Sequence, residues 1–251
     1  MTRLVYFISN ENVRIDHNHM DTTYLTIQNS YTDVQLGLYE NSNCITFVTI
    51  HKHNASALLI DTIKQALDTH HIKLTDLSFI AVNQGPGPFT TLRTVIATVN
   101  GLNFSLGIPL IGIDGIQALL DEHKNKNTPT IALLNAFNQD VYFAIRTPQH
   151  KKITIGSQNI QTLIEQLKLE FSSVDSCTFI GNGAELHQEL ITALMPHSHI
   201  DSTLTYCSLH TIAKKALAQW HNKEYTITQL QPIYIKNTIY NNIDISSKQL
   251  S

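Results

Sequence analysis

The feature that most constrains the fold is the run from Ile80 to Gly112, which reads IAVNQGPGPFTTLRTVIATVNGLNFSLGIPLIG. An apolar stretch at 78–82, typical of a buried strand, leads into a Gly-Pro-Gly corner at 85–87. A helical pattern follows at 89–105, and a second apolar strand follows at 108–113. A strand, a glycine corner, a helix and a strand within about thirty residues predict a βαβ unit.

The corner itself has two interpretations. Gly85 and Gly87 let the backbone turn sharply, and Pro86 stiffens the turn between them. Backbone N–H groups at the start of the following helix, near Thr90, would suit an anion. The corner lacks the lysine of a phosphate-binding P-loop, and it is not GxGxxG. Two alternatives therefore stay open: a weak anion or nucleotide loop at Gly85, Gly87 and Thr90, or a tight turn with no ligand.

The rest of the chain alternates strand patterns with helix patterns in two similar halves. The first half opens with a meander of three strands, predicted at 24–29, 34–40 and 44–50. Helices and strands then alternate, with helices predicted at 55–70, 89–105 and 114–123 and strands at 78–82 and 108–113. A polar stretch at 125–129 is the best linker candidate. The second half predicts strands at 130–136, 141–147, 152–156 and 177–180, with helices at 159–169, 184–194 and 208–221. Periodicity alone indicates only an α/β protein.

Composition narrows the class of protein. The chain has 251 residues, 42% of them hydrophobic, which is enough for one large or two small domains. Its formal net charge is −3, and because nucleic-acid binding normally needs a basic face, we expect no binding of nucleic acid without a partner. Three cysteines without a CxxC pair favour a reducing, cytoplasmic compartment. No apolar run approaches the ~20 residues that span a bilayer, so no membrane association is expected.

The thirteen histidines invite a metal hypothesis. None of them forms an HxxxH pair, and the close pairs are His17/His19, His51/His53, His70/His71 and His197/His199. A strand could place His51 and His53 on one face, but no third ligand is evident near them. We therefore expect ordinary polar histidines and no metal site.

One family matches the central run. The segment 85–113, GPGPFTTLRTVIATVNGLNFSLGIPLIGI, resembles the GPGSFTGLR…A…KGLAFGLGIPLVGV signature of the TsaB (YeaZ) family of bacterial tRNA threonylcarbamoyladenosine biosynthesis proteins. Weaker likenesses flank it in the family's order, at 72–77 (IKLTDL), 180–184 (IGNGA) and 232–236 (PIYIK). The resemblance covers roughly residues 23 to 236.

The resemblance implies an α/β fold with a duplicated ribonuclease-H-like (actin/sugar-kinase, ASKHA) architecture in two subdomains. We place these subdomains at 23–125 and 126–236. Residues 1–22 would then be a poorly ordered N-terminal arm, or would add an edge strand, and Met20 is an alternative start of the chain. Residues 237–251 would form a C-terminal tail.

Three departures from the family pattern weaken any nucleotide site of the chain's own. Gln28 stands where the family has an aspartate at the end of the first strand, and an amide is neither a general base nor a good ligand for a hard dication. The family's Asp-Ala-Arg is Asn135-Ala136-Phe137 here, and Thr91 replaces a glycine. We therefore expect a subunit with no catalytic residue and no cofactor of its own, although a nucleotide at a partner interface stays open.

Small residues on the second helix suggest a partner surface. A stripe at helical spacing is formed by Thr91, Thr94, Thr98, Gly101 and Ser105. The apolar arc of the first helix is widened by Ala57, Leu58 and Ile60. The resemblance implies pairing with the transferase TsaD through these helices. The TsaE ATPase would join the assembly, and tRNA would be reached only through the complex. The stripe could instead pack on the chain's own first helix, and a homodimer of the isolated chain also stays open.

Two other functions remain as alternatives. An ASKHA-type small-molecule kinase or ATPase is disfavoured by Gln28 and by the missing phosphate lysine. A metallopeptidase-like protein is disfavoured by the absence of an HxxxH pair.

Overall fold

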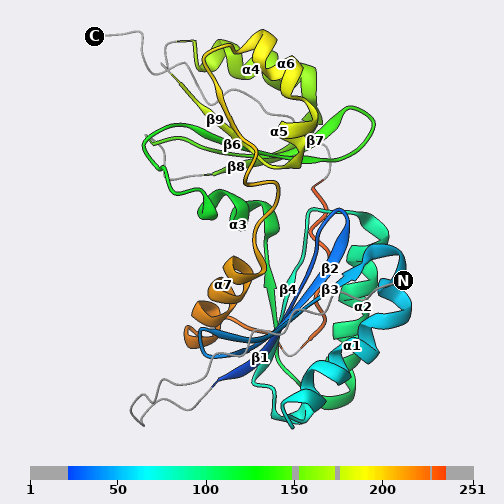
Figure 1. The fold of residues 1–251 in the computed structure, drawn as a ribbon. Helices are drawn as coiled ribbons and strands as arrows, with labels where there is room; N and C mark the ends of the chain where they lie inside the picture. The colour runs from blue at the N-terminus through cyan, green and yellow to red at the C-terminus, as the bar shows by residue number, and fades with distance from the viewer. Residues whose placement is uncertain (1–21, 149–152, 173–175, 227, 236–251) are drawn as a thin grey trace. The chain divides into compact units, whose positions relative to one another are not determined.

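The structure, a computed structural model, describes residues 22–148, 153–172, 176–226 and 228–235. These form two units, and each contains one five-stranded sheet (Figure 1). Among the described residues, the first unit takes those up to Ala118 together with Ser208–Ile233, and the second takes those of Leu119–Cys207 with Tyr234 and Ile235. The expectations for the arm at 1–21 and the tail at 237–251 fall outside the described residues.

The first sheet has the order β3-β2-β1-β4-β5. Its antiparallel meander is β1 (Thr23–Asn29), β2 (Asp33–Glu40) and β3 (Asn43–His51), and β4 (Phe79–Asn83) and β5 (Leu110–Ile113) add parallel to β1. In the central strand, Ile27 lies beside Leu36 on one side and Val82 on the other. Because β4 is covered on both faces, its sequence FIAVN is an almost continuous apolar run, whereas the equally buried β1 also carries polar residues such as Thr26 and Gln28.

Helices cover both faces of this sheet. On one face lie α1 (Ala55–Thr69), which continues a short 3₁₀ turn at Lys52–Asn54, and α2 (Phe89–Leu106), while α7 (Leu209–His221) covers the other (Figure 1). A second 3₁₀ turn, Leu74–Asp76, precedes β4. Gly107 ends α2 in the left-handed conformation, with φ +70°, and its N–H donates to the Asn103 carbonyl. A left-handed glycine is a frequent helix terminator because it carries no Cβ.

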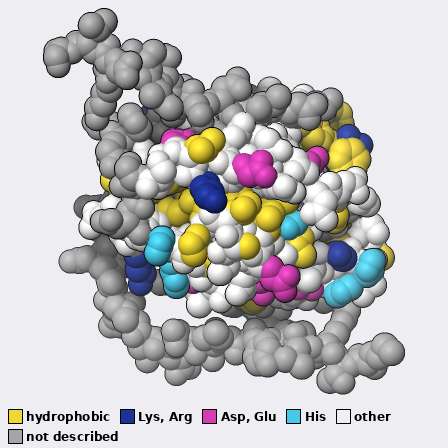
Figure 2. Space-filling model, turned by 90° about the horizontal axis from the view of Figure 1, so that it is seen from above, with side chains coloured by type: hydrophobic (Ala, Val, Ile, Leu, Met, Phe, Trp, Pro, Cys, Tyr) yellow, Lys and Arg dark blue, Asp and Glu magenta, His cyan; other side chains and the backbone are white. Residues whose placement is uncertain are grey.

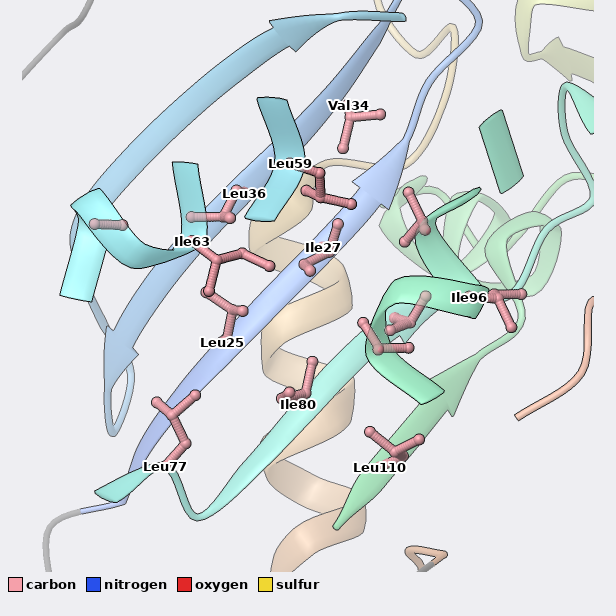
Figure 3. Packing of buried hydrophobic residues seen from close by; sticks show 14 of the residues in the cluster. Leu25, Ile27, Val34, Leu36, Leu59, Ile63, Leu77, Ile80, Ile96 and Leu110 are labelled. Carbon is pink, nitrogen blue, oxygen red and sulfur yellow. The ribbon is translucent and has the colours of Figure 1, made fainter. Parts of the chain in front are cut away.

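The core of the first unit lies between the sheet and helices α1 and α2. Figure 3 shows Leu59 and Ile63 of α1 directed at Leu25 and Ile27 of β1. The buried positions of α1 recur at helical spacing, at Ala55, Leu59, Ile63, Ala66 and Leu67. Each fully buried leucine or isoleucine contributes about 1.5–3 kcal/mol relative to an exposed one, so this face fixes α1 on the sheet.

Helix α7 belongs to the first unit, which differs from the predicted second subdomain at 126–236. Its buried residues Leu209, Ile212, Ala213 and Ala216 form one stripe, and the helix packs on β1, β4 and β5. Trp220 meets Phe79 with ring centroids 5.1 Å apart. Local patterning identifies this helix, but only tertiary packing shows which sheet it covers.

The second sheet repeats the first, in the order β10-β9-β6-β7-β8. Its meander is β6 (Thr130–Asn135), β7 (Asp140–Arg146) and β8 (Thr154–Asn159), with β9 (Thr178–Ile180) and β10 (His199–Asp201) parallel to β6. Its helices are α4 (Ile160–Glu170), α5 (Asn182–Leu186) and α6 (Gln188–Leu194), and α3 (Gly115–Glu122) precedes β6.

Three details of this unit differ from the sequence prediction. The helix expected at 184–194 is broken at His187, which has φ −110° and ψ 22°. The strand expected at 152–156 is β8, which extends to Asn159. Strand β10 has three residues with a single apolar side chain, too short a pattern to predict.

Candidate partner interface on the first unit

Helix α2 buries one face, and its opposite face is exposed in the described part of the chain. The buried side chains are Thr91, Leu92, Val95, Ile96, Val99 and Asn103. On the other side Arg93, Ala97, Gly101 and Phe104 are all exposed, and they succeed one another three or four residues apart along a single line. An 18-residue helix with such a line offers a long, narrow surface to another chain.

The predicted stripe lies on and beside this line except at Thr91, which is on the buried face of α2. Gly101 and Ser105 are exposed, and Thr94 and Thr98 are half-buried. The Thr94 hydroxyl donates to the Thr90 carbonyl at 3.0 Å, and the Thr98 hydroxyl donates to the Thr94 carbonyl at 2.9 Å. Because both hydroxyls donate to carbonyls of the same helix, Thr94 and Thr98 do not present unpaired donors there.

Gly101 opens onto free space. A Cβ built at this position would meet no atom of the described residues within 4 Å. At Gly101, therefore, the stripe does not pack on the chain's own first helix, which was the alternative interpretation. Leu58 is placed differently, because it is half-buried and packs against the core of the first unit.

Sequence reasoning found one of the two most exposed apolar side chains of these helices, Ile60, and missed the other, Phe104. Phe104 of α2 is 88% exposed and Ile60 of α1 is 63% exposed. A phenylalanine in a helix is ordinarily a core residue, so the residue type of Phe104 predicted a buried side chain. A helical wheel placing Phe104 on the same side as Ala97 and Gly101 would have found it.

An aromatic and a cation mark the first turn of α2. The Arg93 guanidinium carbon lies 3.6 Å from the centre of the Phe89 ring, and Phe89 is 54% exposed. Such a cation–π contact holds both side chains in one arrangement at the surface. Thr90, between them in sequence, is exposed.

The Gly-Pro-Gly corner is a tight internal turn at its first glycine. Gly85 has φ +102°, and its N–H donates to Asn83 Oδ1 at 2.8 Å while its carbonyl accepts from the Gly115 N–H at 2.8 Å. The backbone N–H and the carbonyl of Gly85 are thus both hydrogen-bonded within the first unit. Gly87 lies over Asn29, whose amide nitrogen would be 3.0 Å from a Cβ there. Of the predicted anion loop, Gly87 and Thr90 remain as positions that could face a ligand.

Residues 228–233, here named the C-terminal strap, cover one flank of α2. The Asn100 side chain donates to the Leu230 carbonyl at 3.0 Å and accepts from the Leu230 N–H at 2.9 Å. Gln84 Nε2 donates to the Gln231 carbonyl at 2.7 Å, and the Gln84 carbonyl accepts from the Ile233 N–H at 2.9 Å. The strap therefore occupies the Asn100 side of the helix and leaves the line from Arg93 to Phe104 uncovered.

Amides occupy the positions where the family pattern has acids. Gln28 is 1% exposed, and its Nε2 donates across the sheet to Gln35 Oε1 at 3.0 Å. The neighbouring Asn29 is 6% exposed, and its amide atoms have no hydrogen-bond partner among the described residues. In the second unit, Asn135 Oδ1 accepts from the Phe137 N–H at 2.8 Å. The Gln28 side chain thus joins strands β1 and β2, and the Asn135 side chain holds the backbone of the turn at Phe137.

The histidines expected to be ordinary polar residues include two close pairs in the first unit, His51/His53 and His70/His71. The rings of His51 and His53 lie 5.1 Å apart between centroids. Within the described ranges, no group of three or more His, Cys, Asp or Glu side chains could hold a metal ion. The expectation of no metal stays a prediction for the whole chain.

The second unit carries an apolar groove that the sequence did not predict. It encloses about 340 Å³ between the ends of α4 and α6 and is lined mainly by apolar side chains, among them Leu169, Phe171, Leu194 and Met195. Figure 2 looks onto the α4 and α6 side of the molecule, where hydrophobic side chains gather among polar ones. Apolar surface is thus not confined to the first unit.

Comparison with known proteins identifies the family. A family model described as TsaD: tRNA N6-adenosine threonylcarbamoyltransferase matches residues 49–230, which span both units. The chain belongs to the TsaD family. No helix in the described part of the chain is long and apolar enough to cross a membrane.

Several proteins to which the chain is similar carry the names TsaB and YeaZ. The tRNA threonylcarbamoyladenosine biosynthesis protein TsaB of Buchnera aphidicola subsp. Acyrthosiphon pisum (strain APS) is 25% identical over 165 residues, covering 62% of this chain and 75% of that protein. TsaB of Bacillus subtilis (strain 168) is 23% identical over 172 residues, covering 67% and 75%. YeaZ from Pseudomonas aeruginosa has a TM-score of 0.65 at 20% identity, covering 85% of this chain and 99% of that one.

These comparisons confirm the predicted kinship with TsaB (YeaZ). They also confirm the predicted fold, a duplicated ASKHA-like α/β architecture in two subdomains, since the two sheets share one strand order and the YeaZ structure superimposes on most of the chain.

Proposed function

We propose that this chain acts in the synthesis of tRNA threonylcarbamoyladenosine as a non-catalytic scaffold subunit that binds the transferase TsaD. The names of the TsaB proteins to which it is similar support this pathway. The observation that carries the scaffold role is the bare line of α2, where an open position at Gly101 adjoins the 88% exposed Phe104. Exposed aromatics beside small residues are suited to close helix packing across an interface.

The absence of a catalytic role rests on what occupies the family's acidic positions. Gln28 is engaged with Gln35, and Asn135 caps the turn at Phe137. Neither side chain can ionise, so neither can act as a general base or bind a magnesium–nucleotide strongly. In this proposal TsaD supplies the chemistry and TsaE joins the assembly. The net charge of −3 supports tRNA contact through the complex rather than through this chain. The three free cysteines fit the cytoplasm as the compartment.

The proposal gives the chain no cofactor of its own. A nucleotide held jointly with the partner would meet this chain at Gly87 and Thr90, where α2 begins. ADP should therefore raise the melting temperature of the complex with TsaD and leave that of the isolated chain unchanged. A rise for the isolated chain would contradict this part of the proposal.

The interface is tested with Gly101→Arg in a pull-down with the cognate TsaD, followed by reconstitution of tRNA modification. The arginine fills the open position, so binding and modification should be lost while the melting temperature stays within a few degrees. Ala218→Arg is the matched control, since Ala218 is exposed on α7, on the other face of the same sheet. Undiminished binding by Gly101→Arg would refute the interface. A dimer of the isolated chain that Gly101→Arg also dissolves would mean that copies of the chain compete for this surface.

A further inference from the structure

The end of helix α3 is held by a cluster of side chains within the second unit. The last carbonyls of a helix have no partner inside it and are commonly met by cations. Here Arg146 of β7 donates to the Leu120 carbonyl at 2.7 Å, and Lys126 Nζ lies 3.3 Å from the Leu120 carbonyl and 3.2 Å from the Asp121 carbonyl. Two positive side chains therefore bind the α3 terminus to the sheet and to the connection that follows.

His123, the first residue after α3, lies inside this cluster. It is 8% exposed, and its Nδ1 is 3.3 Å from the hydroxyl of Thr130, the fully buried first residue of β6. The same hydroxyl accepts from Arg146 Nη2 at 3.4 Å and donates to the Thr128 carbonyl at 3.3 Å. His123 and Thr130 thus close the segment 123–130, which joins α3 to β6, at both of its ends.

The charges that face His123 oppose a third positive charge there. Burial is the main influence, and the positive charge of Arg146 adds to it, so the pKa of His123 lies below its ordinary value of 6.5. Asp201 of β10 and the backbone of Asn125 raise the pKa of His123, whereas Lys126 lowers it, as Arg146 does. Asp121 acts on Arg146 rather than on the imidazole.

We propose that His123 is a pH-operated latch on the segment 123–130. The neutral imidazole packs against Thr130 and beside Arg146, which keeps the segment closed on the second sheet. A proton on the ring must be accommodated in a buried site already occupied by cations, and opening the segment restores water to it. Because the open form binds the proton more tightly, the equilibrium for opening rises about tenfold for each pH unit below the ordinary histidine value, until the closed form also protonates.

Hydrogen exchange of the full-length protein tests the latch. Exchange rates of the backbone amides in 123–131 are followed between about pH 5 and 8 and corrected for intrinsic exchange. Protection should fall with acidity in the wild type and be nearly independent of pH in His123→Gln. His210→Gln, which removes an exposed histidine on α7 of the first unit, should behave as the wild type. Equal pH dependence in wild type and His123→Gln would overturn the proposal, as would protection in the wild type that does not change with pH.

A second pair of variants covers the case in which His123→Gln fails to fold. Lys126→Met removes a cation and should raise the pKa of His123 measured by NMR titration, whereas Asp201→Asn removes an anion and should lower it. The pH at which segment 123–130 begins to open is set by the ordinary histidine value and stays fixed, but the range of acidity over which opening grows should shorten in Lys126→Met and lengthen in Asp201→Asn. Movement of both variants in the same direction would overturn the electrostatic account of the latch.

Discussion

The two units share one strand order but present different surfaces. In the first, a continuous α2 leaves a ridge that carries Phe104, 88% exposed. In the second, the corresponding segment is broken into α5 and α6, and its apolar surface is a groove of about 340 Å³ beside α4. A duplicated fold thus sets the arrangement of strands, while the length and continuity of one helix decide what each half offers to another molecule.

The two units also differ at the turn that follows the fourth strand of each sheet in chain order, β4 in the first and β9 in the second. Gly85 follows β4 with φ +102°, and Gly181 follows β9 with φ +98°. At Gly181 a Cβ would lie 2.1 Å from the Leu133 carbonyl oxygen, whereas at Gly85 the nearest atom is the end of the Leu92 side chain, at 2.9 Å. The second corner is closed by rigid backbone and the first by a movable side chain.

The largest predicted effect separates these two corners. Gly181→Ala should lower the free energy of unfolding by at least about 3 kcal/mol, because its methyl group meets a fixed carbonyl as well as an unfavourable φ. Gly85→Ala should cost about 1–2 kcal/mol, mostly from φ alone. Urea unfolding of both variants measures the difference. Equal losses would show that the two corners are equally constrained.

The next largest predicted effect is on TsaD binding, and it distinguishes the exposed face of α2 from the exposed surface of the second unit. Phe104→Ala should weaken TsaD binding about thirtyfold, or about 2 kcal/mol, because an exposed aromatic anchor is lost. Its free energy of unfolding should change by less than about 0.5 kcal/mol. Leu186→Ala, on the 59% exposed Leu186 of α5, is the control and should leave affinity unchanged. Titration calorimetry with purified TsaD gives both affinities, and a larger loss in Leu186→Ala would move the interface to the second unit.

The smallest effect should not distinguish the units at all. Asn159 caps α4 by accepting from the Gln161 N–H at 3.1 Å, and Ser208 caps α7 by accepting from the Thr211 N–H at 3.1 Å. Asn159→Ala and Ser208→Ala should each cost about 1 kcal/mol of unfolding free energy, since a helix cap acts locally. A much larger cost in one of them would reveal a tertiary role for that cap.

Local signals made much of this fold predictable. The corner at Gly85–Gly87, the long helix after it and the meander strands depend on glycines, prolines and apolar spacing within a few residues, and these appear where they were expected. The placement of α7 and the break at His187 depend on packing between distant segments, which spacing does not contain. These are two of the points at which the structure differed from the prediction.

The candidate interface was predictable in part for the same reason. Spacing identified Gly101 and its neighbours, but residue type argued that Phe104 should be inside. The engagement of Gly85 by Asn83 and Gly115 could not be read from the sequence, because Gly115 lies thirty residues away in the chain and is brought close only by β5.

The discontinuity of the first unit has a consequence for how the protein is made. Its sheet is completed by α7 and the C-terminal strap, while Leu119–Cys207 of the second unit is synthesised in between. A ribosome adding about 5–20 residues per second takes on the order of ten seconds to travel from α3 to the strap. During that interval the aromatic face of the first sheet around Phe79 lacks the cover that Trp220 later gives it. The nascent first unit should therefore depend on chaperones more than the second, whose five strands all lie within Leu119–Cys207.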